Sequence, residues 1–511
     1  MGKLSNRRLD ALFIEPDSSG AAYQDLSKLY AAIETPTWSL LLGQSCRAKG
    51  YGVGILDQTA ERLNDEQALK KIGQANPRLA VFVIYGQNPN SGTTNMIGAG
   101  RLCAELKKTH PEIKTCFVGS HTSALPREVL GLPFVDFVLL NEGVYALHNL
   151  LATDLQDKIC AVKGIGHKTG GVLVLNEPQA VVPQERMDQD LPGYAWDLLP
   201  FDKKPLDLYR AHFWHAEFSH EKRTPFAAIY TSLGCRFACD FCMINIVNRV
   251  DNTDGVVSAN SRNMRYWSPD FITKEFEKLA GYGVETIRIS DEMFFLDKRY
   301  YEPLCRNIID RGLKFRMWSY SRVDTVRKEF LDLFRRAGIG WLALGVEAGN
   351  QMVRKEVSKG SFQDVNIREV IREVRSQGLN VISNYIFGFP DDTMETMQQT
   401  LDLALELCTE MVNMYPCQAL PGSPLYNTAR QLGWKLPDRP EGFAFLSYES
   451  LPLPTKNVSA AEVLRFRDNA WQRYFQHAPY LELIEKKFGY KERANIEQMR
   501  KIKLRRKILG D

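Results

Sequence analysis

The chain has 511 residues, of which 44% are hydrophobic and 25% are charged, and its formal net charge is +4. A chain of this length is too long for one compact core, so we expect two or three domains with the composition of a soluble globular protein. The small net charge gives no whole-chain electrostatic case for nucleic-acid binding, and no apolar run approaches the roughly 20 residues that span a bilayer.

The cysteine content and the N-terminus indicate the compartment. Ten cysteines over this length are too few for a disulfide scaffold, and most of them stand in apolar stretches, where buried structural thiols are expected. The polar N-terminus lacks the apolar core of a signal peptide. We therefore expect a protein of the reducing cytoplasm.

Residues 1–150 alternate strand and helix signals. The expected strands lie at residues 10–15, 52–56, 79–85, 115–118 and 135–140, and the clearest helices at 38–49 and 99–109. This alternation predicts a doubly wound parallel sheet of the Rossmann-like type, in which ligands bind beyond the carboxyl ends of the strands. No G-x-G-x-x-G sequence follows the first strand, which disfavours a dinucleotide site.

A second alternating series follows a connector. Residues 151–205 are expected to form that connector, with a hairpin over 164–176 and then a proline-rich linker. In residues 206–430 the expected strands lie at 226–231, 286–290, 315–320, 341–346, 381–387 and 412–418. Six strand–helix units predict a partial (β/α)6 barrel. Residues 431–511 predict a mainly helical extension, in which Ser459 and Glu462 form an N-terminal capping box.

Three cysteines stand together just after the first strand of the second series. Cys235, Cys239 and Cys242 have the spacing C-x3-C-x2-C. A [4Fe–4S] cluster that only carries electrons takes four thiolates, so three thiolates on one loop leave one iron open to bind and activate a substrate. A zinc site is the alternative, but it needs a fourth Cys or His, and the next histidine upstream is His220.

These features resemble a known family. The cysteine spacing at the first strand of a partial barrel, with the aromatic Phe241 before the last cysteine, is the signature of radical S-adenosylmethionine (SAM) enzymes. The flanking sequence is similar to the cobalamin-binding branch of that superfamily. The shared pieces are Gly52-Val-Gly-Ile-Leu-Asp57, Asn90-Ser-Gly-Thr-Thr94, Asp136-Phe-Val-Leu-Leu-Asn-Glu-Gly143, Ala337-Gly338 with Glu347-Ala-Gly349, Lys359-Gly360 and Gly388-Phe-Pro-Asp-Asp-Thr393. The resemblance covers residues 8–430, and only the cysteine motif is highly specific.

The resemblance implies that the open iron binds SAM, and that one electron from the cluster cleaves SAM to a 5′-deoxyadenosyl radical, which abstracts a hydrogen atom. The residues expected to bind SAM are Phe241, Asp291, Arg322, Glu347, Gly388 and Pro390. Arg322 suits the methionine carboxylate, whereas Asp291 and Glu347 can accept from the amino group or the ribose. Structural alternatives remain open: Arg322 can pair only with Asp324, Pro390 can turn the chain, and Glu347 can cap the next helix.

The resemblance also implies cobalamin at the carboxyl edge of the first sheet. The residues expected to contact it are Asp57, Gln58, Ser91, Gly92, Thr93, Gly119, Ser120, Glu142 and Gly143. Cobalamin domains that ligate cobalt from below carry Asp-x-His-x-x-Gly, which this chain lacks, and His121 has no such context. We therefore expect cobalamin with its own base displaced (base-off) and no protein histidine ligand. The alternative is a domain that has lost cobalamin.

In this branch methyl transfer is the commonest chemistry, so the first hypothesis is methylation of an unactivated carbon of a lipid or secondary metabolite. A cyclase or other ring-modifying enzyme without methyl transfer is the second. An iron–sulfur electron-transfer protein is the third, disfavoured because carriers fill all four positions.

The expected partners are a small-molecule or lipid substrate and a one-electron reductant such as flavodoxin or ferredoxin. The basic stretch at 500–507 predicts a solvated helix end, with peripheral contact to acidic lipid as the alternative.

Overall fold

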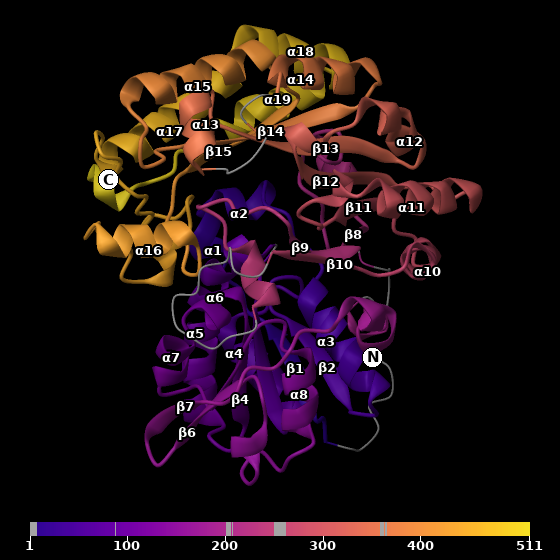
Figure 1. Cartoon of the computed structure of the whole chain (residues 1–511), viewed down its shortest axis with the longest axis vertical. Helices are drawn as coiled ribbons and strands as arrows, with labels where there is room; N and C mark the ends of the chain where they lie inside the picture. The colour runs from indigo at the N-terminus through magenta and orange to yellow at the C-terminus, as the bar shows by residue number, and fades with distance from the viewer. Residues whose placement is uncertain are drawn as a thin grey trace.

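The computed structural model describes residues 8–86, 88–200, 206, 208–249, 262–357, 362 and 365–511. Two parallel sheets dominate these ranges, the N-terminal one in the lower half of Figure 1 and the second in the upper half. Among the helices of the described ranges, none combines the length and the apolar character needed to cross a membrane.

The first sheet confirms the predicted doubly wound fold. Its strands are β1 Ala11–Glu15, β2 Val53–Asp57, β3 Leu79–Ile84, β4 Lys114–Gly119, β5 Phe137–Leu139, β6 Ile165–Thr169 and β7 Val172–Leu175. The order is β2-β1-β3-β4-β5-β6-β7, and β1 to β5 are parallel. The hairpin β6–β7, expected within the connector, instead pairs antiparallel with β5 and extends this sheet.

Helices cover both faces of the first sheet because its strands alternate two apolar surfaces. Ala11 and Phe13 of β1 pack with α3 (Thr37–Ala48) and α8 (Val144–Leu151), whereas the opposite side chains of β1 pack with α4 (Asp65–Ala75) and α5 (Gly92–Thr109). The remaining short helices are α1 Ser19–Tyr23, α2 Leu26–Leu29, α6 Ser120–Ala124 and α7 Pro126–Gly131. Helix α5 begins at Gly92, so residues 92–94 of the piece shared with the cobalamin-binding branch form its first turn.

The described part of the connector, residues 151–200 with the short helix α9 (Met187–Asp190), packs against both domains rather than forming a free linker; residues 201–205 lie outside the described ranges. Tyr194 and Trp196 are buried in the core that is continuous between the two sheets. The Tyr194 hydroxyl donates to the Tyr230 carbonyl at 2.7 Å, and Trp196 Nε1 donates to Glu275 Oε2 at 2.9 Å. The prolines suggested a linker, but aromatic side chains between them bury enough surface to fix the segment.

The second sheet is the predicted six-stranded partial barrel. Its strands are β8 Phe226–Ile229, β11 Thr286–Ile289, β12 Arg316–Arg322, β13 Ile339–Glu347, β14 Asn380–Phe387 and β15 Met411–Pro416. They are all parallel and lie in chain order across the sheet. The intervening helices are α10 Pro269–Gly281, α11 Lys298–Asp310, α12 Leu331–Arg336, α13 Gln351–Val357, α14 Ile367–Ser376 and α15 Met394–Leu407. An unpredicted antiparallel pair, β9 (Ser232–Cys235) with β10 (Asn263–Tyr266), carries the first cysteine.

The C-terminal part is helical as predicted. Its helices are α16 Pro424–Gln431, α17 Ala460–Phe475, α18 Ala478–Phe488 and α19 Tyr490–Met499. Ser459 and Glu462 form the expected capping box of α17. The basic stretch at 500–507 is not a helix end: it leaves α19 as extended chain, and Arg506 within it is only 1% exposed. The prediction of a solvated helix end was therefore wrong for Arg506.

Candidate active site between the two sheets

A cavity of about 1170 Å³ lies where the carboxyl ends of the two sheets face each other. The second domain contributes the three clustered cysteines, on β9 and the loop after it, and residues at or just after the ends of β11, β12 and β13. The first sheet contributes Glu15 and Asp57, the paired last residues of β1 and β2, and the turn after β3. In each sheet this is the edge at which parallel α/β folds bind ligands.

All three cysteines of the motif line this cavity. The Phe237 N–H donates to Cys235 Sγ, and the Ile244 N–H donates to Cys242 Sγ; the N–Sγ distance is 3.4 Å in each case. Burial raises the pKa of Cys235 to about 12 and that of Cys239 to about 11, so the free thiols stay protonated near neutral pH. The backbone donors to Cys235 and Cys242 would stabilise these two side chains as thiolates when iron replaces their protons.

The donor set fits a cluster better than a single ion. Within the described part of the chain, no group of three or more His, Cys, Asp or Glu side chains could hold one metal ion. Thiolates of an iron–sulfur cluster each bind a different iron, so they stand farther apart than the ligands of one zinc ion. His220, the fourth ligand of the zinc alternative, packs on Tyr30 with ring centroids 5.7 Å apart.

Arg322, at the end of β12, both pairs with Asp324 and faces the cavity. Its Nε and Nη2 donate to the Asp324 carboxylate at 2.9 and 2.5 Å. Its buried Nη1 has no hydrogen-bond partner among the described residues. The guanidinium carbon lies 3.6 Å from the centroid of the Phe237 ring, which limits how far the side chain can move. Both sequence alternatives for Arg322 therefore apply: one edge of the guanidinium is fixed by Asp324, and the rest faces the cavity beside Cys239, whose pKa it lowers.

Glu347, the last residue of β13, also lines the cavity. Its backbone φ is +63°, a left-handed conformation that a non-glycine residue adopts only when its surroundings impose it. Burial raises its pKa to about 7, against the opposing charge of Arg322. Near neutral pH the Glu347 carboxyl can therefore either accept a hydrogen bond from a ligand or, when protonated, donate one to it.

Asp291 does not line the cavity, whereas the next residue, Glu292, does. Asp291 is fully buried and accepts hydrogen bonds from the Thr231 N–H, the Thr231 hydroxyl and the Ser232 hydroxyl at 2.5 to 2.6 Å, so it fixes the β8–β9 corner. Glu292 lines the cavity instead, and its buried Oε1 has no hydrogen-bond partner within the described ranges. Burial raises the Glu292 pKa to about 7. The side chains of adjacent residues in extended chain point in opposite directions, so only one of the two acids can face the cavity. The sequence alone did not show which one.

Gly388 and Pro390 do not line the cavity, whereas Phe241 does. Gly388 has φ +86° and donates its N–H to Asp392 at 3.0 Å, and a side chain on Gly388 would overlap Val463. The ring of Phe241 packs on Phe389, with centroids 5.6 Å apart. The rings of Phe241 and Phe389 therefore form an apolar surface beside the cavity.

Of the residues expected to contact cobalamin, Asp57 and Ser91 line the cavity. The others lie behind the wall: Gln58, Gly92, Thr93, Gly119, Ser120, Glu142 and Gly143. Gln58 is held by the Asp17 N–H at 2.9 Å and by Asp65 at 2.7 Å. Glu142 is buried in an ion pair with Arg265 of β10 at 2.8 Å, which fastens the first sheet to the β9–β10 pair that carries the first cysteine.

The predicted glycines of the first sheet serve close packing. A methyl group at Gly92 would overlap the Ser120 hydroxyl and the Ile84 carbonyl oxygen, and one at Gly119 would overlap the Ile84 backbone. The Ser120 hydroxyl donates to the Pro89 carbonyl at 2.6 Å. These residues therefore hold the turn at 88–91 against the ends of β3 and β4, and that turn is what reaches the cavity.

Histidine is sparse at the cavity. Among the described residues that line it, His212 is the one histidine; it precedes β8, and its Nε2 lies 3.5 Å from Glu34 Oε1. His121 is buried against Thr93, with its Nδ1 3.0 Å from the hydroxyl, and burial lowers its pKa to about 4. His121 therefore stays behind the wall as a neutral structural side chain.

Sequence reasoning missed Glu15, which lies beside Asp57 in the β1–β2 register. The Ser39 hydroxyl donates to Glu15 at 2.6 Å, and the Tyr209 hydroxyl donates to Asp57 at 3.2 Å. Burial raises the pKa of Glu15 to about 8 and that of Asp57 to about 7. Two protonated carboxyls at one sheet edge can donate hydrogen bonds to amide carbonyls of a ligand. An acid ending each of two adjacent strands was the signal available in the sequence.

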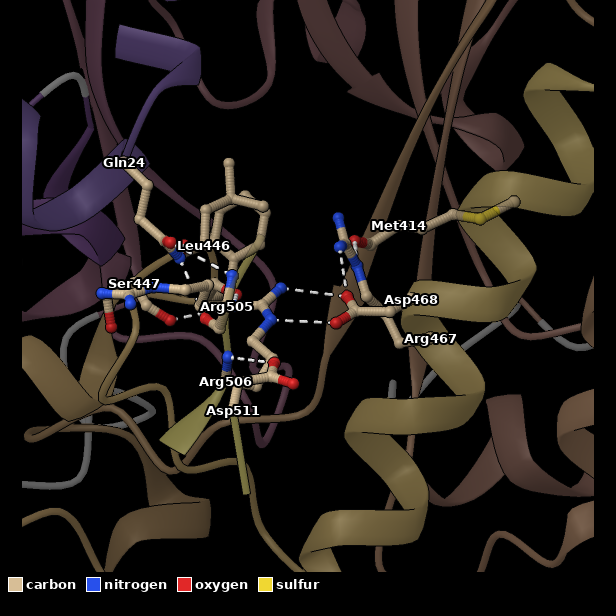
Figure 2. A network of polar contacts seen from close by, with 10 residues as sticks. Gln24, Met414, Leu446, Ser447, Arg467, Asp468, Arg505, Arg506 and Asp511 are labelled. Carbon is tan, nitrogen blue, oxygen red and sulfur yellow. Dashed lines mark hydrogen bonds and ion pairs between the residues drawn. The ribbon is translucent and has the colours of Figure 1, made fainter. Parts of the chain in front are cut away.

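The C-terminal segment closes one side of the cavity. Residues 443–446 and 499–504 line it. Gln24, just after α1, is hydrogen-bonded to both segments of the C-terminal part. Its Nε2 donates to the Leu446 carbonyl at 2.8 Å and to the Arg505 carbonyl at 3.1 Å. In Figure 2, Arg506 lies beside Asp468 of α17, and two hydrogen bonds of 2.9 Å join them.

Two family models match the two halves of this arrangement. A B12 binding domain model matches residues 29–151, and a Radical SAM superfamily model matches residues 229–404. The chain is a member of the radical SAM superfamily with a B12-binding domain. The family prediction made from the cysteine motif and its flanking pieces is thereby confirmed.

Individual relatives cover most of this radical SAM chain. It is 23% identical over 385 residues to an uncharacterized methyltransferase of Pyrococcus horikoshii, covering 74% of this chain and 75% of that protein. It is 25% identical over 482 residues to the anaerobic magnesium-protoporphyrin IX monomethyl ester cyclase of Rubrivivax gelatinosus, covering 92% and 78%. Its fold is similar to that of the methyltransferase TsrM from Kitasatospora setae, with TM-score 0.64 and 16% identity, covering 97% of this chain and 99% of that one.

Proposed function

We propose that this protein is a cobalamin-dependent radical SAM methyltransferase that acts on an unactivated carbon of a lipid-like or secondary-metabolite-like molecule. The observation that carries the proposal is the single cavity, which both the three cysteines and the strand ends of the B12-binding domain line. At about 1170 Å³ it exceeds the roughly 300–1,000 Å³ of a typical small-ligand pocket, so it has room for more than one ligand.

When bound, the cluster with SAM supplies a 5′-deoxyadenosyl radical, and cobalamin supplies the methyl group. The chain's own residues orient these molecules. Arg322 offers its unpartnered Nη1 to a carboxylate, and Glu292 and Glu347 offer acceptors to an ammonium or hydroxyl group. Phe241 offers an apolar face to a purine ring. On the opposite wall the protonated forms of Glu15 and Asp57 would donate hydrogen bonds to amide oxygens of a corrin rim.

The wall of the cavity favours an apolar or ring-containing substrate. Trp318 and Tyr415 of the barrel and Phe443, Phe445 and Trp471 of the C-terminal part line it. Rigid aromatic side chains bury much ligand surface and exclude water, which keeps a carbon radical away from solvent. We further propose a one-electron reductant of the flavodoxin or ferredoxin type, because Arg236 of the cysteine loop is exposed and suits an acidic carrier.

Ring chemistry without methyl transfer is the second candidate. The similarity to the Rubrivivax gelatinosus cyclase extends over 92% of this chain and therefore includes parts of the C-terminal region as well as both domains. The two candidates differ in their products, because methyl transfer consumes a second SAM to recharge the cobalt.

The test is product analysis after anaerobic reconstitution with iron, sulfide and cobalamin. Cobalamin that copurifies with a base-off spectrum, together with both 5′-deoxyadenosine and S-adenosylhomocysteine from SAM and a reductant, would support the methyltransferase. 5′-Deoxyadenosine without S-adenosylhomocysteine would support ring chemistry. A protein that binds no cobalamin would contradict the methyltransferase.

A further inference from the structure

Asn90 connects the B12-binding domain directly to the cysteine loop. It lies in the short turn Pro89–Ser91 that follows β3, and it lines the shared cavity together with Cys242. Its Oδ1 accepts a hydrogen bond from the Met243 N–H at 2.9 Å, and its Nδ2 donates to Cys242 Sγ at 3.4 Å. One side chain of the first domain thus contacts a ligand-bearing cysteine of the second.

The contact with Met243 decides which end of the amide faces the sulfur. A backbone N–H only donates, so its partner must be the amide oxygen, and the NH2 group is left towards Cys242. A reverse hydrogen bond, from the Cys242 thiol to Asn90 Oδ1 at 3.6 Å, requires a proton on sulfur. A cysteine that binds iron has lost that proton, so only donation from Nδ2 remains.

The donor is held in place before any cluster is bound. The Ser120 hydroxyl fixes the Pro89 carbonyl at 2.6 Å, and the Ser91 hydroxyl fixes the Asn88 carbonyl at 2.9 Å. The absence of a side chain at Gly92 lets this turn approach the end of β3. Asn90 therefore has little freedom to lose when its NH2 group meets a thiolate.

We propose that Asn90 is a positioning residue that raises the reduction potential of the iron–sulfur cluster by donating a hydrogen bond to the Cys242 thiolate. The proposal rests on the proposed function only in requiring the cluster. Reduction adds negative charge to the cluster and its sulfurs, and a hydrogen bond to sulfur stabilises the more negative state. Because the donor belongs to the B12-binding domain, the contact between the two domains sets part of the potential.

The test is an EPR-monitored redox titration of the reconstituted cluster, without SAM or cobalamin. Asn90→Leu removes the donor and keeps the branched shape of the side chain. Asn95→Leu makes the same change at another cavity residue, whose backbone carbonyl accepts from the Ser18 hydroxyl and whose side chain makes no hydrogen bond to the cysteine loop within the described residues. We expect the midpoint of Asn90→Leu to be more negative than that of the unmodified protein, and the midpoint of Asn95→Leu to be unchanged. Equal midpoints in all three proteins, with equal iron, would overturn the proposal.

A second measurement does not depend on how Asn90→Leu folds. In protein labelled with ¹⁵N-asparagine, pulsed EPR of the reduced cluster should show a nitrogen coupling that is lost in Asn90→Asp, which keeps the acceptor for the Met243 N–H but has no Nδ2. No coupling in the unmodified protein, or a coupling that persists in Asn90→Asp, would overturn the proposal. Failure of the unmodified protein to hold iron would overturn the cluster itself, and with it both proposals.

Discussion

The buried pair between Arg506 and Asp468 should control whether the C-terminal segment stays closed over the cavity. Arg506 donates twice to Asp468, and its Nη1 donates to the carbonyls of Phe445 and Ser447, all at 2.9 Å. Replacing Arg506 by Met removes all four hydrogen bonds. Breaking a buried pair by removing one partner costs about 3–5 kcal/mol. Asp468 keeps Arg467 at 2.8 Å, so we expect about 3 kcal/mol, the lower end of that range.

This cost should appear as local opening rather than global unfolding, because the pair fastens a terminal segment to a large core. A change of about 3 kcal/mol corresponds to about 100-fold in the population of the open state. The assay is hydrogen–deuterium exchange of the peptide covering residues 504–511, in which the Lys507 N–H is protected by the Tyr448 carbonyl at 2.9 Å. We expect about 100-fold faster exchange there in Arg506→Met, and unchanged exchange in β12 and β13.

Lys507→Met is the matched control. Lys507 pairs with Glu449 at 2.9 Å, but its side chain is 62% exposed. An exposed pair contributes about 0–1 kcal/mol, so exchange should rise by no more than about fivefold. Equal exchange rates in Arg506→Met and Lys507→Met would refute the idea that the buried pair is what closes the segment.

Three other outcomes are expected. Cys239→Ala should lose most of the iron that the reconstituted protein binds, and iron and absorbance kept at the unmodified level would contradict the cluster. Arg322→Lys should weaken SAM binding in calorimetry at least about tenfold, because an ammonium cannot hold Asp324 with two donors and keep a third for a ligand; an unchanged affinity would remove Arg322 from the site. In the ligand-free protein, Glu15 and Asp57 have folded pKa values of about 8 and about 7, above their ordinary 4.5 and 3.8. Between these values the folded state binds more protons than the unfolded state, so the free energy of unfolding should fall as pH rises from about 4 to 8. Urea denaturation at a series of pH values should show a smaller fall in Glu15→Gln, and stability that rises over this window would show that these acids are ionised in the fold.

The repeating apolar strands and the cysteine spacing were sufficient to predict both sheets and the cysteine edge of the cavity. Each of these features is local in sequence, since a buried strand is a short apolar run and the three cysteines stand within one loop. The sequence could not show which of Asp291 and Glu292 lines the cavity. That depends on the direction in which each side chain points after β11, and this direction is set by the fold.

Contacts between distant segments account for the rest. Glu142 was expected to meet a cofactor, but its partner Arg265 comes from the other domain and neutralises it in the interior. Arg506 was expected to be solvated, but Asp468, 38 residues earlier, buries it. Asn90 contacts Cys242 across 152 residues of sequence. No local pattern announces such partners, because buried charges and amides acquire their roles from the tertiary fold.

The most direct test of a shared two-cofactor cavity is the magnetic interaction between the cofactors. Protein loaded with both the reduced cluster and cob(II)alamin should show EPR signals broadened or split by spin–spin coupling, because one cavity is lined by both the cysteine loop and the B12-binding domain. Asn95→Leu should leave this coupling in place, whereas Cys239→Ala should remove it together with the cluster signal. Two full-strength signals that superimpose on those of the separately loaded proteins would contradict the shared cavity.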